Sequence, residues 1–207
     1  MIKYINYEMC KKCGGICCKQ TGCAYSPKDF KKLEFNYLIN LLNEGNISIS
    51  GQPTPFPQIK DAWTYIPYLR ARNQDAEIVD LITKGGPCKL LTDTGCSLEE
   101  SLRPSMGLSI KPTVLGGPCQ NMYTGDIASK WLEHSELLTQ LVKFYTHKDI
   151  PDIISKQLYD RLDTISEKIK LSIELTEMEK SIIVWYKQIM CNKPYYTPEE
   201  VKKLIKI

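Results

Sequence analysis

The sequence lacks the long apolar runs of membrane proteins. No segment approaches the ~18 consecutive apolar residues that a membrane-spanning helix needs. The N-terminal stretch MIKYINYEMCKK has neither the continuous apolar core nor the small-residue cleavage site of a secretory signal peptide. We therefore expect a cytoplasmic protein with no membrane partner.

A strong excess of charge of one sign is missing as well. The 27 Lys and Arg residues nearly balance the 24 Asp and Glu residues, which leaves a net charge of +3, and the lysines are dispersed. Extended phosphate-binding surfaces need clustered positive charge, so nucleic acid is not an electrostatically indicated partner, although this balance leaves room for small basic patches. With 207 residues, 43% of them hydrophobic, the chain can form a core without disulfides.

The signature motifs of several common enzyme classes are also absent. The chain has no P-loop, no GxGxxG, no GxSxG elbow and no HExxH, and its cysteine spacing differs from the CxxxCxxC of radical-SAM enzymes. Only two histidines are present, so a cysteine–histidine catalytic pair is possible but unsupported. We interpret His134, on an apolar helical stripe, as a core residue, and His147 as a helix-end residue that interacts with the helix dipole.

Cysteine, in contrast, is abundant. The chain has nine cysteines, and the segment CKKCGGICC places Cys10, Cys13, Cys17 and Cys18 close together, with Cys23 following. In a reducing compartment, clustered thiols are more often metal ligands or redox groups than structural disulfides, and an odd number leaves one unpaired. A surface loop with free thiols is the simpler alternative. Cys23 fits a ligand and a small buried residue equally well.

A second group of cysteines follows about seventy residues later. Cys88 and Cys96 are separated by seven residues, and Cys119 ends the second of two GGPC tetrapeptides, at 85–88 and 116–119, whose glycines let the backbone turn close to a ligand. Closing the loop from Cys18 to Cys88 costs about 4 kcal/mol, whereas structural zinc yields roughly 10 to 16 kcal/mol in small peptides. We predict one metal site with ligands among Cys10, Cys13, Cys17, Cys18, Cys23, Cys88, Cys96 and Cys119.

The kind of metal follows less directly from the pattern. Thiolates bind zinc in tetrahedral sites and also hold iron–sulfur clusters. The chain offers more candidate thiolates than the four that one zinc ion needs, and this surplus favours an iron–sulfur cluster or a multinuclear site as the cofactor, with zinc as the alternative. Cys191, far from the others in sequence, is interpreted as a packed thiol rather than a ligand.

The same residues resemble a known family. CKKCGGICC, then CKLLTDTGCSLEESLRP, is similar to the YkgJ-type CxxCxxCC cysteine-cluster proteins, which are described as zinc- or iron-chelating domains. The resemblance covers residues 10–23 and 85–119 and implies a metal-chelating function. Two departures are visible: the first run has GGI where the family name gives two residues, and no cysteine closely follows Arg103 and Pro104. Cys119 is our candidate replacement.

The distribution of apolar residues predicts an α+β, helix-rich fold. We expect a cysteine-rich, metal-organised region over 1–125, with a helix from Ser26 to Gly45, a strand fragment followed by an extended loop over 46–60, and an extended segment over 62–72. A helical region over 126–207 should pack on it within one domain. EIVDLI at 77–82 is ambiguous. Within the helical region, Thr176 and Glu179 predict a capping box between two helices, and a last helix begins after Thr197.

Three functions are consistent with these features. The preferred one is a metal-binding cysteine-cluster protein with a redox or accessory role in the cytoplasm. The second is a metal-cluster enzyme in a modification pathway, as in the related flagellin lysine methylases, with a substrate pocket lined by residues 61–72 and Arg103. The third is a zinc-stabilised module that binds a protein partner through its C-terminal helices. Arg70, Arg72 and Arg103 fit an anionic ligand, although solvated arginines or a buried ion pair are more usual.

Overall fold

The computed structural model describes residues 12, 14–55, 63–83, 85–111, 120–121, 127–190 and 197–205. Within these ranges the fold is α+β with helices predominating, and its strands form three two-stranded antiparallel sheets. The predicted fold class is confirmed at this level. None of the described helices combines the length and apolarity needed to cross a membrane.

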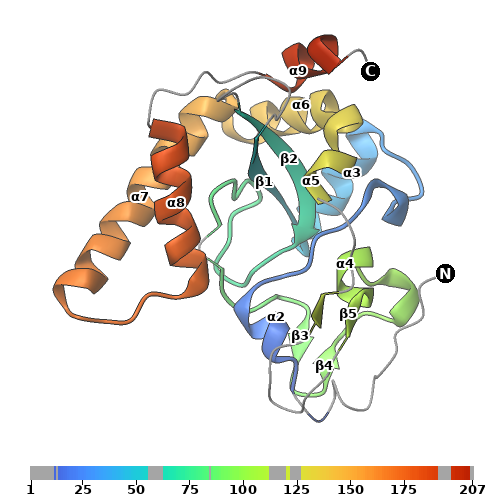
Figure 1. Ribbon diagram of the computed structural model, residues 1–207. Helices are drawn as coiled ribbons and strands as arrows, with labels where there is room; N and C mark the ends of the chain where they lie inside the picture. The colour runs from blue at the N-terminus through green and yellow to red at the C-terminus, as the bar shows by residue number, and fades with distance from the viewer. Residues whose placement is uncertain are drawn as a thin grey trace.

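The elements fall into two groups along the chain (Figure 1). The first group, up to residue 121, is made of short elements apart from one hairpin: α2 (Ile16–Gln20), η1 (Pro27–Asp29), α3 (Phe35–Asn43), β1 (Ile47–Pro55), β2 (Trp63–Ala71), β3 (Leu91–Thr92), β4 (Gly95–Cys96), η2 (Glu100–Leu102), α4 (Ser105–Leu108), β5 (Ile110–Lys111) and β6 (Gln120–Asn121). The second group is helical: α5 (Ile127–Lys130), η3 (Leu132–His134), α6 (Ser135–Thr146), α7 (Ile150–Lys170), α8 (Glu177–Met190) and α9 (Pro198–Ile205).

The β1–β2 hairpin is the centre of the fold. Its register pairs Ile49 with Leu69 and Gly51 with Pro67, and the ring of Tyr65 lies so close to Gly51 that a Cβ there would meet it at 2.0 Å. Glycine at position 51 is therefore required for the ring to pack across the hairpin. The predicted extended segment over 62–72 is confirmed as β2.

Each outer edge of the hairpin is partly covered by a neighbouring segment. On the β1 side, Ile49 forms a parallel bridge with Val79, and on the β2 side Arg70 forms an antiparallel bridge with Ala24. The ambiguous segment 77–82 is thus neither a helix nor a full strand. Gln157 of α7 holds it, because its side chain donates to Val79 O at 2.9 Å and accepts from Ile82 N at 2.9 Å.

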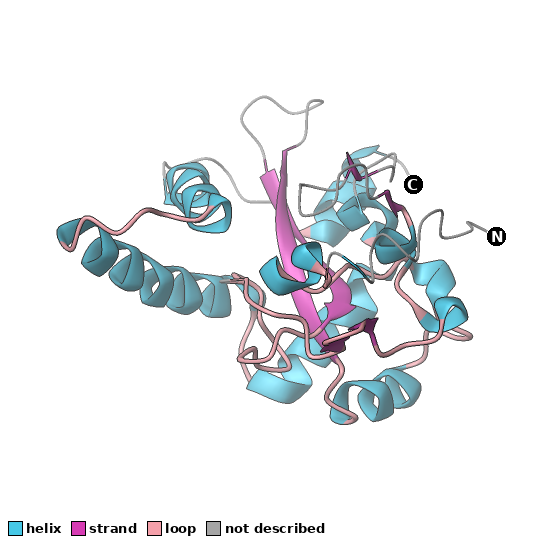
Figure 2. Ribbon diagram, turned by 90° about the horizontal axis from the view of Figure 1, so that it is seen from below, coloured by secondary structure: helices cyan, strands magenta, loops and turns pink. Residues whose placement is uncertain are grey.

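Helices pack on both sides of the hairpin. Figure 1 and Figure 2 show α7 and α8 together on one side of the hairpin, and Figure 1 shows α3 and α5 on its other side. α5, α6 and α9 contact β2, and α3 and α5 contact β1. The core between these layers contains the largest fully buried side chains: Trp131, Tyr65, Leu38, Leu42, Ile49, Ile66, Leu69, Leu81, Ile82, Leu138, Leu141 and Leu158.

The helical region follows its sequence signals closely. The Glu179 carboxylate accepts from Thr176 N at 2.8 Å while Thr176 Oγ1 accepts from Glu179 N at 3.2 Å, so the predicted capping box begins α8 and separates it from α7. Thr197 and Glu200 form the same pair of hydrogen bonds at the start of α9. Both predicted helix starts are confirmed.

The predicted helix from Ser26 is wrong in its first half. Ser26 and Pro27 begin only the short η1 turn, and α3 starts at Phe35. The reason is a tertiary contact: the Asp29 carboxylate accepts from Ser26 N at 2.8 Å and from Ser105 N at 2.9 Å, which fixes the turn against the start of α4. Gly45, at φ 80°, ends α3 as expected.

Candidate metal centre

The segment that carries Cys23 lies along the free edge of β2. Ala71 N donates to Cys23 O at 2.8 Å, and Tyr25 N donates to Leu69 O at 2.9 Å. Gly22 makes this approach possible, because a Cβ at that position would lie 2.0 Å from Ala71 O. The position of Cys23 is therefore set by backbone contacts with the central hairpin.

The segment that carries Cys88 lies against α2. Cys88 N donates to Cys18 O at 2.8 Å, and Gly86 N donates to Gln20 O at 2.7 Å. Gly85 and Gly86 have φ values of 79° and 111°, in the region that favours glycine, which accounts for the glycines of the first GGPC. Cys18 and Cys88, about seventy residues apart in the sequence, are thus brought together by hydrogen bonds between peptide groups.

Asn73 connects these two segments. Its side chain is buried, accepts from Gly22 N at 2.7 Å and donates to Thr83 Oγ1 at 3.2 Å, while its backbone forms a bridge with Cys88. Each polar end of the amide therefore has a partner, as buried amides require. No sequence motif marked Asn73 as part of the site.

The β3–β4 hairpin turns the chain back and carries Cys96. Its register pairs Cys96 with Leu91, and Gly95 has a φ of 109° at the turn. Beyond it, Arg103 donates from Nε to Leu98 O at 3.0 Å, and α4 follows directly. We call residues 14–23 and 85–111 together the cysteine lobe; its elements lie together at one end of the hairpin (Figure 1).

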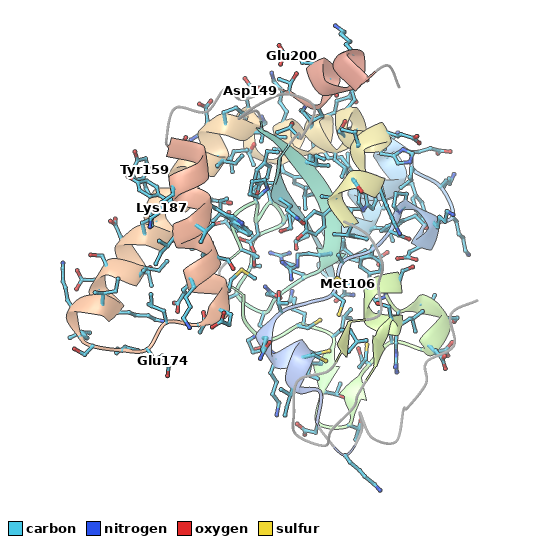
Figure 3. The ribbon with its side chains drawn as sticks, in the orientation of Figure 1. Met106, Asp149, Tyr159, Glu174, Lys187 and Glu200 are labelled. Carbon is cyan, nitrogen blue, oxygen red and sulfur yellow. The ribbon has the colours of Figure 1, made fainter. Side chains whose placement is uncertain are left out.

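All five cysteines of the cysteine lobe line one cavity. The cavity has a volume of about 60 Å³, and its remaining wall is largely apolar or glycine, with Arg103 as its one charged residue among the described positions. Figure 3 shows sulfur atoms gathered between α2 and α4, near the labelled Met106. The cysteines are Cys17, Cys18, Cys23, Cys88 and Cys96.

The size of the cavity restricts what it can hold. Pockets for drug-sized organic molecules measure roughly 300 to 1,000 Å³, whereas one water molecule needs only about 10 to 15 Å³. A space of about 60 Å³ therefore suits an ion or a compact inorganic group rather than an organic substrate. Of residues 61–72, suggested above as a substrate pocket, only Ala71 lines the cavity among those that the structure describes.

The thiols in this cavity influence one another. A hydrogen bond between the Cys17 and Cys18 side chains, followed by burial, raises the pKa of Cys17 far above the usual range of a thiol. The hydrogen bond with Cys17 lowers the pKa of Cys18. A hydrogen bond with Cys23, burial and the nearby Cys88 have the opposite effect and together outweigh it, so the pKa of Cys18 is raised overall. Burial also raises the pKa of Cys88. These groups are neutral thiols unless a cation replaces their protons, so they are poor nucleophiles.

The donor set fits a thiophilic metal, but the side chains are not arranged around one. Of the residue types that commonly bind metals, the described cavity wall contains cysteine but no His, Asp or Glu. Cysteine is the ligand that zinc and iron–sulfur clusters prefer. Among the described residues, no group of three or more such side chains is arranged to hold a metal ion. Binding would therefore require side-chain rotation or ligands from elsewhere in the chain.

The other predicted residues divide into two sets. Cys10, Cys13 and Cys119, together with Cys191 and the second GGPC, lie outside the described residues. The histidines lie in the helical region: His134 is half-buried with its ring edge-on to Trp131, and His147 ends α6 at φ 55°, donating its N–H to Lys143 O. His134 is therefore not the fully buried core residue that was predicted, whereas His147 does lie at a helix end; neither lines the cavity.

Comparison of the chain with protein-family models, with curated proteins and with solved structures finds no match. The similarity to YkgJ-type proteins rests on the cysteine-containing segments quoted above and stays a prediction.

Proposed function

We propose that the cavity of the cysteine lobe is the core of a polythiolate metal centre, and that the protein is a metal-binding cysteine-cluster protein with a redox or accessory role in the cytoplasm. The observation that carries this proposal is the convergence of five thiols from two distant segments on one small cavity. An iron–sulfur cluster is the preferred cofactor because the chain offers more thiols than one zinc ion needs. Such a cluster would supply one-electron chemistry.

The ligand assignment follows from the same convergence. Cys17, Cys18, Cys23, Cys88 and Cys96 are the described candidates, and Cys10, Cys13 and Cys119 are candidates by sequence. The absence of a carboxylate from the described wall disfavours hard cations such as Mg²⁺ and Ca²⁺, which take oxygen ligands.

Anaerobic purification with metal analysis tests the proposal. We expect stoichiometric iron with acid-labile sulfide, or stoichiometric zinc, and a reducible visible chromophore only in the first case. Cys88→Ser and Cys119→Ser should both lose metal, whereas Cys191→Ser, outside the predicted ligand set, should keep it. A folded protein that contains no metal and has all nine thiols freely titratable would contradict the proposal.

A second candidate is the zinc-stabilised interaction module. The observation in its favour is apolar surface on the α7–α8 pair, where Tyr159 and Val184 are each 52% exposed. Tyr159 points away from the body of the molecule in Figure 3. Zinc without a visible chromophore, together with an unchanged metal content after Tyr159→Ser, is the result expected of this module.

A further inference from the structure

Arg70 is a buried cation that lacks an acidic partner among the described residues. The residue is only 4% exposed, at a position of β2 that pairs with Ser48. Its Nη2 donates to Gly22 O at 2.5 Å and also to Thr21 Oγ1, both of which are uncharged acceptors. Its Nε is buried without a hydrogen-bond partner, and none of the ion pairs in the described part of the chain includes Arg70.

A buried guanidinium with only uncharged partners destabilises the folded state. A guanidinium does not lose its proton in proteins, so it cannot become neutral as a buried lysine can. Burial of an ion without a counter-charge disfavours folding by several kcal/mol in general, and partners are the rule for buried charges. Asp80 illustrates the rule in this chain, because its buried carboxylate lies 3.4 Å from Nη2 of Arg161.

The cysteines of the cavity are groups near Arg70 that can become anionic. Arg70 is hydrogen-bonded to the residue that precedes Cys23, and Ala71, the next residue of β2, lines the cavity. The charge of Arg70 also acts on Cys88, where it opposes the effect of burial on the thiol pKa. The guanidinium therefore lies against the segment that carries Cys23, close enough to Cys88 for its charge to act on that thiol.

We propose that Arg70 is the internal counter-charge of the metal centre. Four thiolates around one divalent cation leave two net negative charges, and Arg70 supplies a fixed positive charge beside them inside the protein. This inference rests on the proposed metal centre. It assigns Arg70 a positioning role through charge and not direct ligation, since arginine has no acceptor atom for a metal.

Zinc affinity separates this role from simple packing. Zn²⁺ is titrated into the reduced, metal-free protein against a chromophoric chelator. Arg70→Met removes the charge and should weaken zinc binding at least about tenfold, or ~1.4 kcal/mol. Arg70→Lys keeps a positive charge in the zinc-loaded site, because the nearby thiolates favour the charged ammonium, and should stay within about threefold of the wild type. Thr21→Val removes an uncharged partner of Arg70, and Arg72→Met removes a neighbouring charge that donates to Ala76 O; both should leave the affinity unchanged.

A second measurement uses the iron–sulfur form, reconstituted anaerobically with iron and sulfide. Loss of a nearby positive charge should shift the reduction potential of Arg70→Met to more negative values, while Arg70→Lys keeps the wild-type potential. Equal zinc affinities for wild type and Arg70→Met would overturn the inference and leave the metal centre standing. A wild type that binds neither zinc nor a cluster overturns both.

The test does not depend on the stability of one variant. Where Arg70→Met cannot be purified, Arg70→Gln replaces it, because it removes the charge but keeps a hydrogen-bond donor: a tenfold loss in Arg70→Gln with wild-type affinity in Arg70→Lys supports a charge effect. Wild-type affinity in Arg70→Gln, or an equal loss in Thr21→Val, shows that the charge of Arg70 does not govern the site and overturns the inference.

Discussion

The helical region, residues 127–190, and the cysteine lobe differ in how much apolar surface they bury. Helix α6 alone buries Leu138, Leu141 and Val142, and α7 buries a further set of aliphatic side chains. In residues 85–111 of the cysteine lobe, Cys88 and Leu90 are the buried members of the hydrophobic class among the described positions. The longest regular element of the lobe has five residues, against 21 in α7.

This difference assigns the two regions different sources of stability. Packing of amphipathic helices supplies most helical stability in proteins, so α6 and α7 have what they need in their own sequence. The cysteine lobe instead depends on backbone hydrogen bonds to the central hairpin and, under the proposed function, on a shared metal. The comparison predicts that changes to packing affect the helical region most and that removal of metal affects the lobe most.

The largest effect is expected from Trp131→Ala in the helical region. Trp131 is fully buried, and its Nε1 donates to Tyr25 O at 2.8 Å. The substitution leaves a large cavity and an unpaired carbonyl, so the free energy of unfolding should fall by about 3 to 5 kcal/mol. Chemical denaturation measures this loss of unfolding free energy. Val184→Ala on the exposed face of α8 is the control and should cost less than about 0.5 kcal/mol; equal losses in the two variants would contradict the packing argument.

Metal removal should destabilise the cysteine lobe more than the helical region. Treatment of metal-loaded protein with a chelator should speed hydrogen exchange of the Gly86 and Cys88 amides at least about tenfold, equivalent to ~1.4 kcal/mol, while the amides of Leu141 and Val142 change little. The first pair bonds to α2 across the lobe, whereas the second lies inside α6. Mild acid should act in the same order, because protons compete with metal for thiolates. Uniform acceleration along the chain would show one cooperative unit.

Local sequence signals predicted the helical region well, for a physical reason. A capping box is complete within about four residues, so Thr176 with Glu179 and Thr197 with Glu200 identify helix starts without knowledge of the fold. The error at Ser26 has the opposite cause. There the decisive bond joins Asp29 to Ser105, 76 residues away, and no local pattern contains that information.

The candidate site was predictable only in part for the same reason. Spacing alone indicated that the segments of Cys18 and Cys88 converge, and the structure places both on one cavity. Spacing could not show that peptide hydrogen bonds already join those segments, nor that Asn73 connects them. Arg70 was visible in the sequence, but whether it has an acidic partner depends on tertiary neighbours.

A smaller effect is expected at the start of α8, through pH. Burial acts to raise the pKa of the Glu179 carboxyl, but the hydrogen bond from Lys168, at 2.6 Å, and those from Thr176 lower it below its usual value overall. The folded state thus holds the proton less tightly than the unfolded state. The ionised Glu179 carboxylate therefore stabilises the folded state at pH values above the pKa that it has in the unfolded chain. This contribution is lost as the pH falls through the lower pKa that it has in the folded protein.

Glu179→Gln isolates this charge, because glutamine retains the capping geometry. The variant should lose about 1 kcal/mol at about pH 7, and the difference from wild type should vanish as the pH falls below the folded pKa. Denaturation curves recorded between neutral and acidic pH measure this difference in unfolding free energy. The control is Glu177→Gln in the same helical turn, whose exposed pair with Lys180 should contribute much less. A difference that grows toward low pH would contradict the assignment.

The smallest effect is expected from a change at Gly107, a glycine of the cavity wall. Gly107 lies in α4 on that wall, and a Cβ there would lie 3.5 Å from both Cβ and Sγ of Cys23, an ordinary contact distance. Gly107→Cys should therefore fit without strain and add one thiolate to the site. We expect zinc affinity to rise roughly threefold, or ~0.7 kcal/mol. Gly107→Ser is the matched control, since its oxygen is a poorer partner for a thiophilic metal.

The same variant also tests the geometry without any metal. Disulfides form when two Cβ atoms lie about 3.5 to 4.5 Å apart, and the separation expected between positions 107 and 23 falls at the lower end of that range. Mild oxidation of metal-free Gly107→Cys should therefore join the introduced thiol to Cys23, which peptide mass mapping detects, and bound zinc should protect both thiols. If the disulfide forms while Gly107→Cys and Gly107→Ser bind zinc equally, α4 is correctly placed but the metal lies elsewhere in the cysteine lobe. If no disulfide forms, α4 does not close the cavity beside Cys23.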